Sequence, residues 1–501
     1  MENITICKCF LSYGVIVMSA LKRFSKADEL YMQTELDPET TKLVPDQFVH
    51  RYSAAPLETG CSMVTAENTG KDVDALVTRY FEMPNVKKAI LEVDEAVDEG
   101  CGTDSPIIQI VNAIIHQAVH EGASDIHVEP FKEQVVVRFR VDGVLHRRFK
   151  LPHRIIYPLV SRIKVMANLD ITERRLPQDG RFPFELSNCD LELRVSTVPT
   201  IFGEKVAIRI LDKGSIENYT LENLNFSPRN YEMMRGFLER PSGLLLVTGP
   251  TGSGKSTTLF TALKNINSVE KNIVTVEDPV EYVLEGVNQT QINSKAGATF
   301  ATYLRSILRQ DPDVIMIGEI RDLETAKIAV RAATTGHLVL STMHTNDAPG
   351  ALSRLVDMGV EPFMAASSVL GVVSQRLVRR VCIHCQENRQ MNELELTLAG
   401  VVNYQKMVRF AKGCSMCSHT GYRGRSAIHE ILEVSMDLQK LILQRAPTSK
   451  LRSAALEEGM ISMEEDGIWK ALRGITTIQE VMRVAREEEK LSNIPRRLLR
   501  L

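Results

Sequence analysis

The chain has 501 residues, which is too long for one compact domain and predicts two to four. A hydrophobic fraction of 44% and a charged fraction of 25% favour a soluble globular protein over a disordered or fibrous chain. The formal net charge of −3 and the single Trp give no general reason to expect a nucleic-acid partner. The apolar run from Phe10 to Leu21 is too short to span a bilayer, and no other segment predicts a membrane-spanning helix.

The first 100 residues carry weak structural signals. We expect residues 1–27 to be a disordered or untranslated leader, with Met18 as an alternative start to Met1. Residues 28–100 predict a small helical N-terminal domain, and the acidic, turn-rich stretch "DEGCGTDSP" after it predicts a domain boundary.

The next segment, residues 103–213, predicts an α+β domain. It opens on a helix that Ser105 can cap and Pro106 can begin, with apolar residues on one face as far as Gly122. Alternating strands follow, joined at the hairpin turn Asp142-Gly143. A further helix and two more strands complete the domain.

Residues 214–240 predict a linker with a helix, and residues 241–490 predict an α/β domain. Four apolar strands, "LLLVTG", "IVTVED", "VIMIGE" and "HLVLST", alternate with helical segments there. This order predicts a mostly parallel sheet covered by helices, with the functional site at the carboxyl ends of the strands. The pattern from about 425 to 487 predicts helices, and residues 491–501 predict a fraying tail.

The stretch "GPTGSGKST" matches the P-loop pattern and lies between a predicted strand and a predicted helix. Its glycines let successive backbone amides face a phosphate, Lys255 can reach the β and γ phosphates, and the Ser256 hydroxyl can bind Mg²⁺. The alternative is a chance match in a glycine-rich turn. The predicted ATP-binding residues are Gly249, Pro250, Thr251, Gly252, Ser253, Gly254, Lys255, Ser256 and Thr257.

The stretch "DPDVIMIGEIRD" lacks the aspartate that often precedes the catalytic glutamate of P-loop enzymes. Asp313 begins the predicted strand and Glu319 ends it, so roughly 20 Å of extended chain separates the two carboxylates. Asp313 and the more distant Asp311 therefore cannot share a metal with Glu319. We predict that Glu319 activates the attacking water, the alternative being a solvated carboxylate at a strand end.

A second acidic strand end, "VEDPVEY", offers the missing negative charge. We predict that Glu277 and Asp278 reach the metal through water, with Glu281 farther out, although Asp278-Pro279 is also a common turn sequence. His344 follows the predicted strand "HLVLST" and is a candidate γ-phosphate sensor, although a lone histidine is more often structural. His337, at the start of the same strand, is a weaker candidate.

Arginines could stabilise the charge on a transferred phosphoryl group. Arg305 and Arg309 lie on one face of a predicted helix, and Arg194 and Arg209 lie on two strands of the preceding domain. Taken alone, each arginine is more typical of a surface or ion-pairing residue.

Two Cys-x-x-Cys pairs, separated by 28 residues, predict a structural zinc site made by Cys382, Cys385, Cys414 and Cys417. His384 and His419 could substitute as ligands, and a redox pair is the alternative. The other five cysteines are scattered and predict reduced thiols in a cytoplasmic protein.

Taken together, these motifs resemble the secretion ATPases of type II secretion systems and type IV pilus assembly, across residues 103 to 487. The resemblance rests on "GASDIHVEP", "RLPQDGRF", "RVSTVPT", "GPTGSGKSTT", "TVEDPVEY", "LRQDPDVIMIGEIRDLETA", "TGHLVLSTMHTNDA", "QRLVRR" and the four cysteines.

The resemblance implies a cytoplasmic hexamer in which an α+β domain is joined flexibly to a RecA-like ATPase domain. It also implies an Asp box at Glu277, Asp278 and Glu281, a degenerate Walker B motif ending in Glu319, and a His box containing His337 and His344. It further implies that Arg194, Arg209, Arg305 and Arg309 surround the phosphates.

The resemblance implies peripheral association with the inner membrane through partners. The motor would act on an inner-membrane platform protein, and the first 100 residues, which match only loosely at "LVPDQFVHRY", would dock on a membrane-anchored protein. The choice between type II secretion and pilus extension stays open. The rivals are a conjugation-type or other nucleic-acid motor, which the near-neutral charge disfavours, and a non-catalytic nucleotide-gated scaffold.

Overall fold

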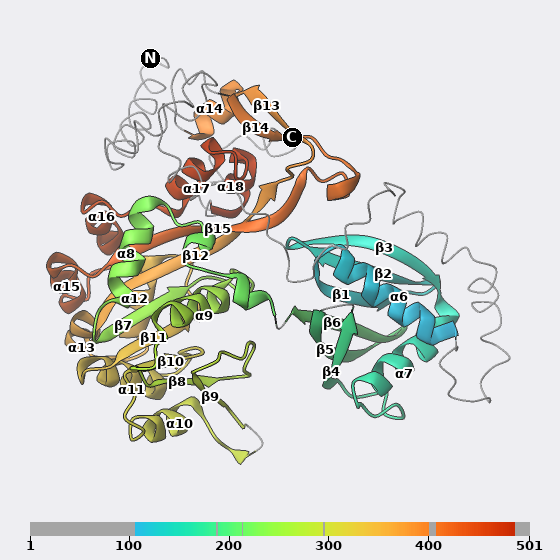
Figure 1. Cartoon of the computed structure of the whole chain (residues 1–501), viewed down its shortest axis with the longest axis horizontal. Coiled ribbons are helices and arrows are strands. Elements are labelled where there is room, and N and C mark those ends of the chain that lie inside the picture. The colour runs from blue at the N-terminus through green and yellow to red at the C-terminus, as the bar shows by residue number, and fades with distance from the viewer. Residues whose placement is uncertain (1–105, 187–188, 213, 294–295, 400–406, 486–501) are drawn as a thin grey trace. The chain divides into compact units, whose positions relative to one another are not determined.

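The computed structural model describes residues 106–186, 189–212, 214–293, 296–399 and 407–485. The expected leader (1–27), N-terminal domain (28–100) and tail (491–501) lie outside the described residues. The described chain forms two compact units that divide after Asn218 (Figure 1). The other domain limits expected from the sequence stay predictions.

The N-terminal unit begins with the expected helix, α6 (Pro106–His120), which ends before Gly122 at a φ of 68°. The strands β1 (Ala123–Pro130), β2 (Gln134–Val141) and β3 (Val144–Pro152) follow. Asp142 and Gly143 both have positive φ values, 48° and 82°, so the expected hairpin turn is present between β2 and β3.

A helix and three more strands complete this unit as an antiparallel sheet in the order β3-β2-β1-β6-β5-β4. α6 and α7 pack on one face, where Phe139 and Leu193 are fully buried. Arg194 and Arg209 are cross-strand neighbours, and Arg194 alternates with the buried Leu193, so this pair lies on the opposite face. The further elements are η1 (His153–Ile155), α7 (Ile156–Met166), β4 (Gln178–Leu186), β5 (Cys189–Thr200), β6 (Gly203–Asp212) and η2 (Ser215–Asn218).

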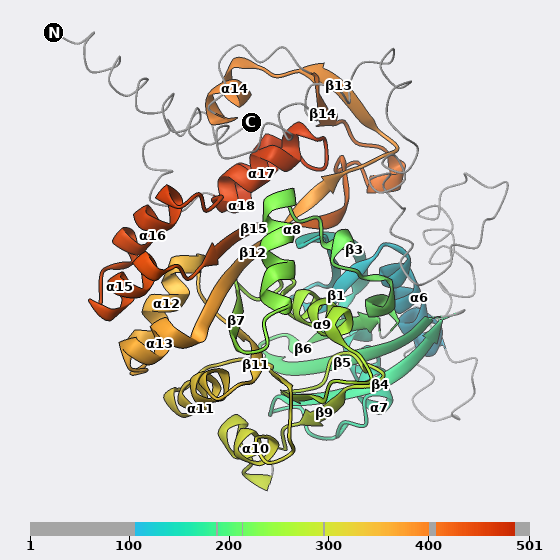
Figure 2. The same ribbon diagram turned by 60° about the vertical axis from the view of Figure 1, so that its left-hand side comes forward.

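The C-terminal unit is built on a seven-stranded sheet in the order β15-β12-β7-β11-β10-β8-β9 (Figure 2). All neighbours are parallel except β12 and β15, which confirms the expected α/β class. The elements up to β11 are η3 (Glu222–Leu224), α8 (Pro228–Leu238), β7 (Gly243–Thr248), α9 (Lys255–Ile266), β8 (Ile273–Glu277), β9 (Asn288–Gln291), α10 (Phe300–Ile307), β10 (Val314–Ile317), α11 (Leu323–Thr334) and β11 (Leu338–Met343).

The two faces of this sheet have different coverings. One face packs on α10, α11, α12, α13, α15 and α16 through a continuous apolar core that includes Leu246, Ile317 and Val339. The other face meets α8, where Phe237 lies against Gly371, and α9, where Thr258 bonds to β12. Because both faces are covered, the central strands are continuous apolar runs.

The cysteine-bearing segment leaves the end of β12, forms a small hairpin and returns into β15. The elements from β11 onward are α12 (Ala348–Asp357), α13 (Pro362–Ser368), β12 (Val369–Val381), β13 (Gln386–Gln390), α14 (Glu393–Ala399), β14 (Met407–Ala411), η5 (Ser415–Cys417), β15 (Tyr422–Glu433), α15 (Met436–Leu443), α16 (Thr448–Glu457), α17 (Met463–Leu472) and α18 (Ile478–Ala485).

The prediction of helices from about residue 425 was wrong for its first residues, because β15 runs to Glu433. Residues 426–432 of β15 are all buried, so the strand shows no alternation by which sequence can tell it from a buried helix. From α15 onward the tail is helical as expected. Among the described residues, none of the helices combines the length and hydropathy that a bilayer crossing needs.

Candidate nucleotide site

The P-loop connects the central strand β7 to α9 and forms a tight curl. Gly249, Gly252 and Gly254 have φ values of 143°, 77° and 87°, which side chains with a Cβ rarely adopt. Lys255 begins α9, so the amino end of that helix opens toward the loop. Its Nζ donates to the main-chain carbonyls of Gly249 at 2.9 Å and Pro250 at 3.0 Å.

Two carboxylates act electrostatically on the Lys255 ammonium. Burial lowers the pKa of Lys255, while the negative charges of Glu319 and Glu281 raise it. Lys255 follows β7 and Glu319 follows β10, so the P-loop lysine and the candidate catalytic acid lie at the same, carboxyl edge of the sheet.

Glu319 lies two residues beyond β10, at the carboxyl end of the strand. Its side chain is 14% exposed, with Oε1 2.5 Å from Nη2 of Arg321 and Oε2 3.7 Å from Nε2 of His344. Because β10 and β11 are parallel neighbours, Glu319 and His344 leave the sheet at the same edge. Both residues lie at the carboxyl ends of their strands, as predicted from the sequence.

Asp311 and Asp313 lie at the opposite edge. The Asp313 carboxylate accepts a hydrogen bond from the Asn272 backbone N–H at 2.7 Å, just before β8 begins. The Asp311 carbonyl accepts from the side chain of the same Asn272 at 2.8 Å. Both aspartates thus hold the amino ends of β8 and β10 together, as the strand-length argument requires.

The three acids of the "VEDPVEY" stretch have different environments. Glu277 is 3% exposed and accepts hydrogen bonds from Thr275 at 2.6 Å and Gln289 at 3.0 Å, and burial raises its pKa. Asp278 is exposed. The negative charge of Glu281, expected farther out, raises the pKa of Lys255. The metal roles of Glu277 and Asp278 stay predictions, and the two hydrogen bonds of Glu277 favour an anchoring role for that residue.

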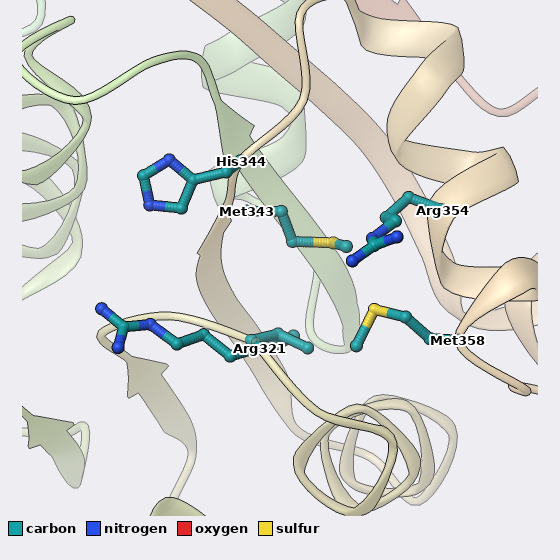
Figure 3. A pocket seen from close by; sticks show the side chains of 6 residues that line it. Arg321, Met343, His344, Arg354 and Met358 are labelled. Carbon is teal, nitrogen blue, oxygen red and sulfur yellow. The ribbon is translucent and has the colours of Figure 1, made fainter.

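His344 borders a cavity of about 130 Å³ beside Glu319 (Figure 3). Burial lowers the pKa of His344, the positive charges of Lys255 and Arg321 lower it further, and Glu319 raises it. The cavity is lined by Ile320, Arg321, Met343, His344, Arg354 and Met358. His337 lies before β11, at the far edge of the sheet, with Nδ1 3.0 Å from the Ala332 carbonyl oxygen.

The candidate arginines have partners of their own in the structure. Arg305 pairs with Glu324 of α11, and Arg309 donates to Ser306 at 3.5 Å. In the N-terminal unit, Arg194 pairs with Glu192 at 3.4 Å and Arg209 with Asp125 at 3.0 Å. Their expected role around the phosphates therefore stays a prediction.

Sequence reasoning missed Arg321 and Gln375. Arg321 lies two residues after the expected acid, but its pairing with Glu319 depends on how the chain turns after β10. Gln375 is 1% exposed and contacts both the P-loop and α9. The signal that could have identified it is a polar residue within an apolar strand, because a buried amide needs hydrogen-bond partners.

The four predicted cysteines form a compact cluster. Their sulfurs all lie within 4.8 Å of one another, and the Sγ atoms of Cys385 and Cys417 are 3.8 Å apart. A tetrahedron with zinc–sulfur bonds of about 2.3 Å has edges of about 3.8 Å, so the spacing fits zinc. Burial raises the pKa of Cys417, but N–H donors from Cys414 and Gly421 lower it to about 7. Burial also raises the pKa of Cys382 and raises that of Cys385 to about 12, so the fit to zinc rests on the sulfur spacing.

A mostly parallel sheet with a P-loop after the interior strand β7, and an acid after β10 at the same carboxyl edge, defines a RecA-like P-loop ATPase. The family model "Type II/IV secretion system protein" matches residues 101–483, and the chain belongs to this family.

The chain is 47% identical to "Type II secretion system protein E" of Pseudomonas aeruginosa over 86% of this chain and 84% of that protein. It is 44% identical to "Type IV pilus assembly ATPase PilB" of Thermus thermophilus over 82% of this chain and 47% of that protein. Among solved structures, the pilus retraction motor PilT with bound ADP matches with a TM-score of 0.50 and 26% identity over 77% of this chain and 99% of that one. The Legionella pneumophila ATPase DotB shares the fold, with a TM-score of 0.57 and 19% identity over 77% of this chain and 97% of that one.

Proposed function

We propose that the protein is a cytoplasmic, homohexameric ATPase motor that drives assembly of a pseudopilus at the inner membrane during type II protein secretion. The observation that carries the hydrolytic part is that the P-loop with Lys255 and the acid Glu319 lie at the same carboxyl edge of the parallel sheet. The secretion part is supported by the family and by the 47% identity to a type II secretion protein E.

In the proposed reaction the P-loop amides and Lys255 would hold the ATP phosphates, and the Ser256 hydroxyl would bind Mg²⁺. The metal, when bound, would stabilise the negative charge that develops on the β and γ phosphates as ADP leaves. Glu319 orients the attacking water and accepts its proton. His344 lies close enough to Glu319 to sense the γ-phosphate.

Acids and arginines around this centre complete the proposal. Glu277 anchors the β8–β9 connection through Thr275 and Gln289, while Asp278 and Glu281 supply the negative charge that the Walker B stretch lacks. Arginines from both units respond to the phosphates: Arg194, Arg209, Arg305 and Arg309. Release of the present ion pairs of Arg194, Arg209 and Arg305 would accompany nucleotide binding.

The zinc site is proposed to be structural, because four thiolates leave no open coordination position. Cys382, Cys385, Cys414 and Cys417 would hold the ion and staple the hairpin to the ends of β12 and β15. The proposed partners are an inner-membrane platform protein and a membrane-anchored docking protein that binds the N-terminal domain. No nucleic-acid partner is proposed.

The test is a chromosomal Lys255→Ala variant in the native host. We expect the variant to lose ATP turnover and to leave secreted proteins inside the cell, while pili on the cell surface persist. Wild-type secretion by this strain would contradict the role in type II secretion.

Pilus extension is the second candidate, favoured by the 44% identity to a pilus assembly ATPase. It predicts the reverse outcome in the same strain: pili disappear and secretion continues. Stimulation of the purified protein's turnover by single-stranded or duplex DNA would instead support a nucleic-acid motor.

A further inference from the structure

Gln375 is a polar side chain in a strand interior, within β12 and beside the central strand β7. It is 1% exposed, so its amide must find partners inside the protein. Its side chain makes hydrogen bonds both to the P-loop and to α9, the helix that follows the loop.

The two ends of the Gln375 amide contact different parts of the phosphate site. Oε1 accepts from the Thr258 hydroxyl of α9 at 2.7 Å, and Nε2 donates to the Ser253 carbonyl of the loop at 2.7 Å. Thr258 and Ser253 are themselves buried, at 1% and 3% exposed. One side chain thus joins the loop to the first turns of the helix.

The bond to the Ser253 carbonyl also decides where a neighbouring amide points. The Ser253 carbonyl and the Gly254 N–H belong to one planar trans peptide, so they point in opposite directions. When Gln375 holds the carbonyl toward β12, the Gly254 N–H faces away from β12. That amide lies directly before Lys255, where a P-loop binds phosphate.

The P-loop also packs so closely against Gln375 that a Cβ atom has no room at Gly249 or Gly254. A Cβ at Gly254 would lie 2.9 Å from Gln375 Nε2, and a Cβ at Gly249 would lie 2.4 Å from the Gln375 carbonyl oxygen. Both glycines have positive φ values. The curl of the loop is therefore shaped against this one residue.

We infer that Gln375 is a positioning residue of the nucleotide site, which turns the Ser253–Gly254 peptide so that its N–H donates to a nucleotide phosphate. This inference rests on the proposed ATP-binding function. Gln375 acts through the loop backbone and does not itself contact the nucleotide.

The test uses the full-length protein and three variants. Gln375→Met keeps the size of the side chain and removes both hydrogen bonds. Gln375→Glu keeps the acceptor for Thr258 but sets a carboxylate oxygen against the Ser253 carbonyl. Thr258→Val removes one bond and leaves the bond to Ser253. Gln117→Met is the matched control, because Gln117 is also buried but lies on α6.

The measurements are the Kd for Mg·ADP, the KM and kcat for ATP, and the Tm without nucleotide. For Gln375→Met we expect Kd and KM to rise about tenfold, with kcat retained, because a phosphate contact is lost in the ground state and the transition state alike. Thr258→Val should raise Kd about threefold. Gln375→Glu should bind weakly at about pH 8 and recover as the pH is lowered, because a protonated carboxyl regains a donor for the Ser253 carbonyl.

The results separate this role from general stability. Gln117→Met should lower Tm and leave Kd unchanged. A wild-type Kd in Gln375→Met, or a loss of kcat alone, would overturn the inference. If Gln375→Met does not fold, the pH-dependent recovery of Gln375→Glu decides, and failure to recover counts against the role. If the wild type itself neither binds Mg·ADP nor hydrolyses ATP, the proposed function has failed instead.

Discussion

The guanidinium of Arg321 lies 2.5 Å from the carboxylate of Glu319, the acid that ends the β10 segment. Arg321 is 70% exposed, whereas Glu319 is 14% exposed, so the arginine covers the acid from the solvent side. The same carboxylate lies 3.7 Å from Nε2 of His344, and its negative charge raises the pKa of Lys255. Replacement of Glu319, which we propose as the water-activating acid, is the most direct test of the site.

For Glu319→Gln we expect ATP binding within a few-fold of wild type and turnover reduced by about 10² to 10⁴, because the amide cannot accept the proton of the water. Steady-state ATPase assays and nucleotide titration measure the two effects. Asp313→Asn is the control: it lies at the far edge of the sheet and should leave turnover unchanged. Near-normal turnover in Glu319→Gln would remove the catalytic role.

The acidic residues of the β8–β9 connection can be ranked by how much their substitution raises the Mg²⁺ concentration needed for half-maximal turnover. Glu281→Gln should raise the Mg²⁺ concentration for half-maximal turnover about tenfold, because Glu281 carries charge near Lys255. Asp278→Asn should act in the same direction. Glu277→Gln should change it least, because that carboxylate is occupied by Thr275 and Gln289. A requirement raised most by Glu277→Gln would instead support a metal role for Glu277.

The change of Tm with pH should reveal the lowered pKa of His344. Its pKa in the folded protein is lowered below 6.5, mainly by burial, so the unfolded chain binds more protons as the pH falls through and below 6.5. His344 therefore makes the folded state less stable in acid. When the pH is lowered from about 7.5 to 5.5, the Tm of His344→Gln should fall by less than the Tm of the wild type. His116, His127 and His429 shift in the same direction and are common to both proteins. An equal loss of Tm would show that His344 titrates normally.

The loop after His344 is held by an ion-paired triad. Arg452 of α16 lies 3.2 Å from the Asp347 carboxylate and 3.4 Å from that of Glu430, which is 1% exposed. Arg452→Met should destabilise the protein by about 3 kcal/mol, because it leaves a buried carboxylate uncompensated. Adding Glu430→Gln should restore part of this loss in urea unfolding. No recovery in the double variant would mean that Arg452 acts through packing alone.

Metal removal should affect the cysteine hairpin and not the nucleotide. Chelation, or Cys385→Ser, should release zinc, lower Tm and expose residues 382–417 to protease, while the Kd for Mg·ADP stays unchanged. His384→Ala and His419→Ala should keep one zinc per chain if the four sulfurs are the ligands. Loss of zinc in either histidine variant would revise the ligand set, and loss of ADP binding on chelation would contradict a purely structural ion.

Much of the site could be predicted because its residues are local in sequence. The P-loop is nine consecutive residues between a strand and a helix, so its amides, Lys255 and Ser256 come together without long-range contacts. Strand length alone moved Asp313 away from Glu319 and put His344 at the carboxyl end of its strand, whereas the pairing of β10 with β11 brought His344 beside Glu319. The cysteine spacing likewise predicted a cluster that the fold does form.

Tertiary structure decided the contacts between segments far apart in the chain. Gln375 is more than 100 residues from the loop that it holds, and nothing in its neighbourhood in the sequence names Ser253 or Thr258 as partners. The charge of Glu281, in the connection after β8, acts on Lys255 of α9, and β15 pairs with β12 at the edge of the sheet. Sequence patterns carry the periodicity of apolar residues and the backbone conformations that each residue allows, and these determined the helices, the strands and the P-loop. Partners across the sheet depend on how those elements pack, and the packing assigned Gln375, Arg321 and Arg452 their neighbours.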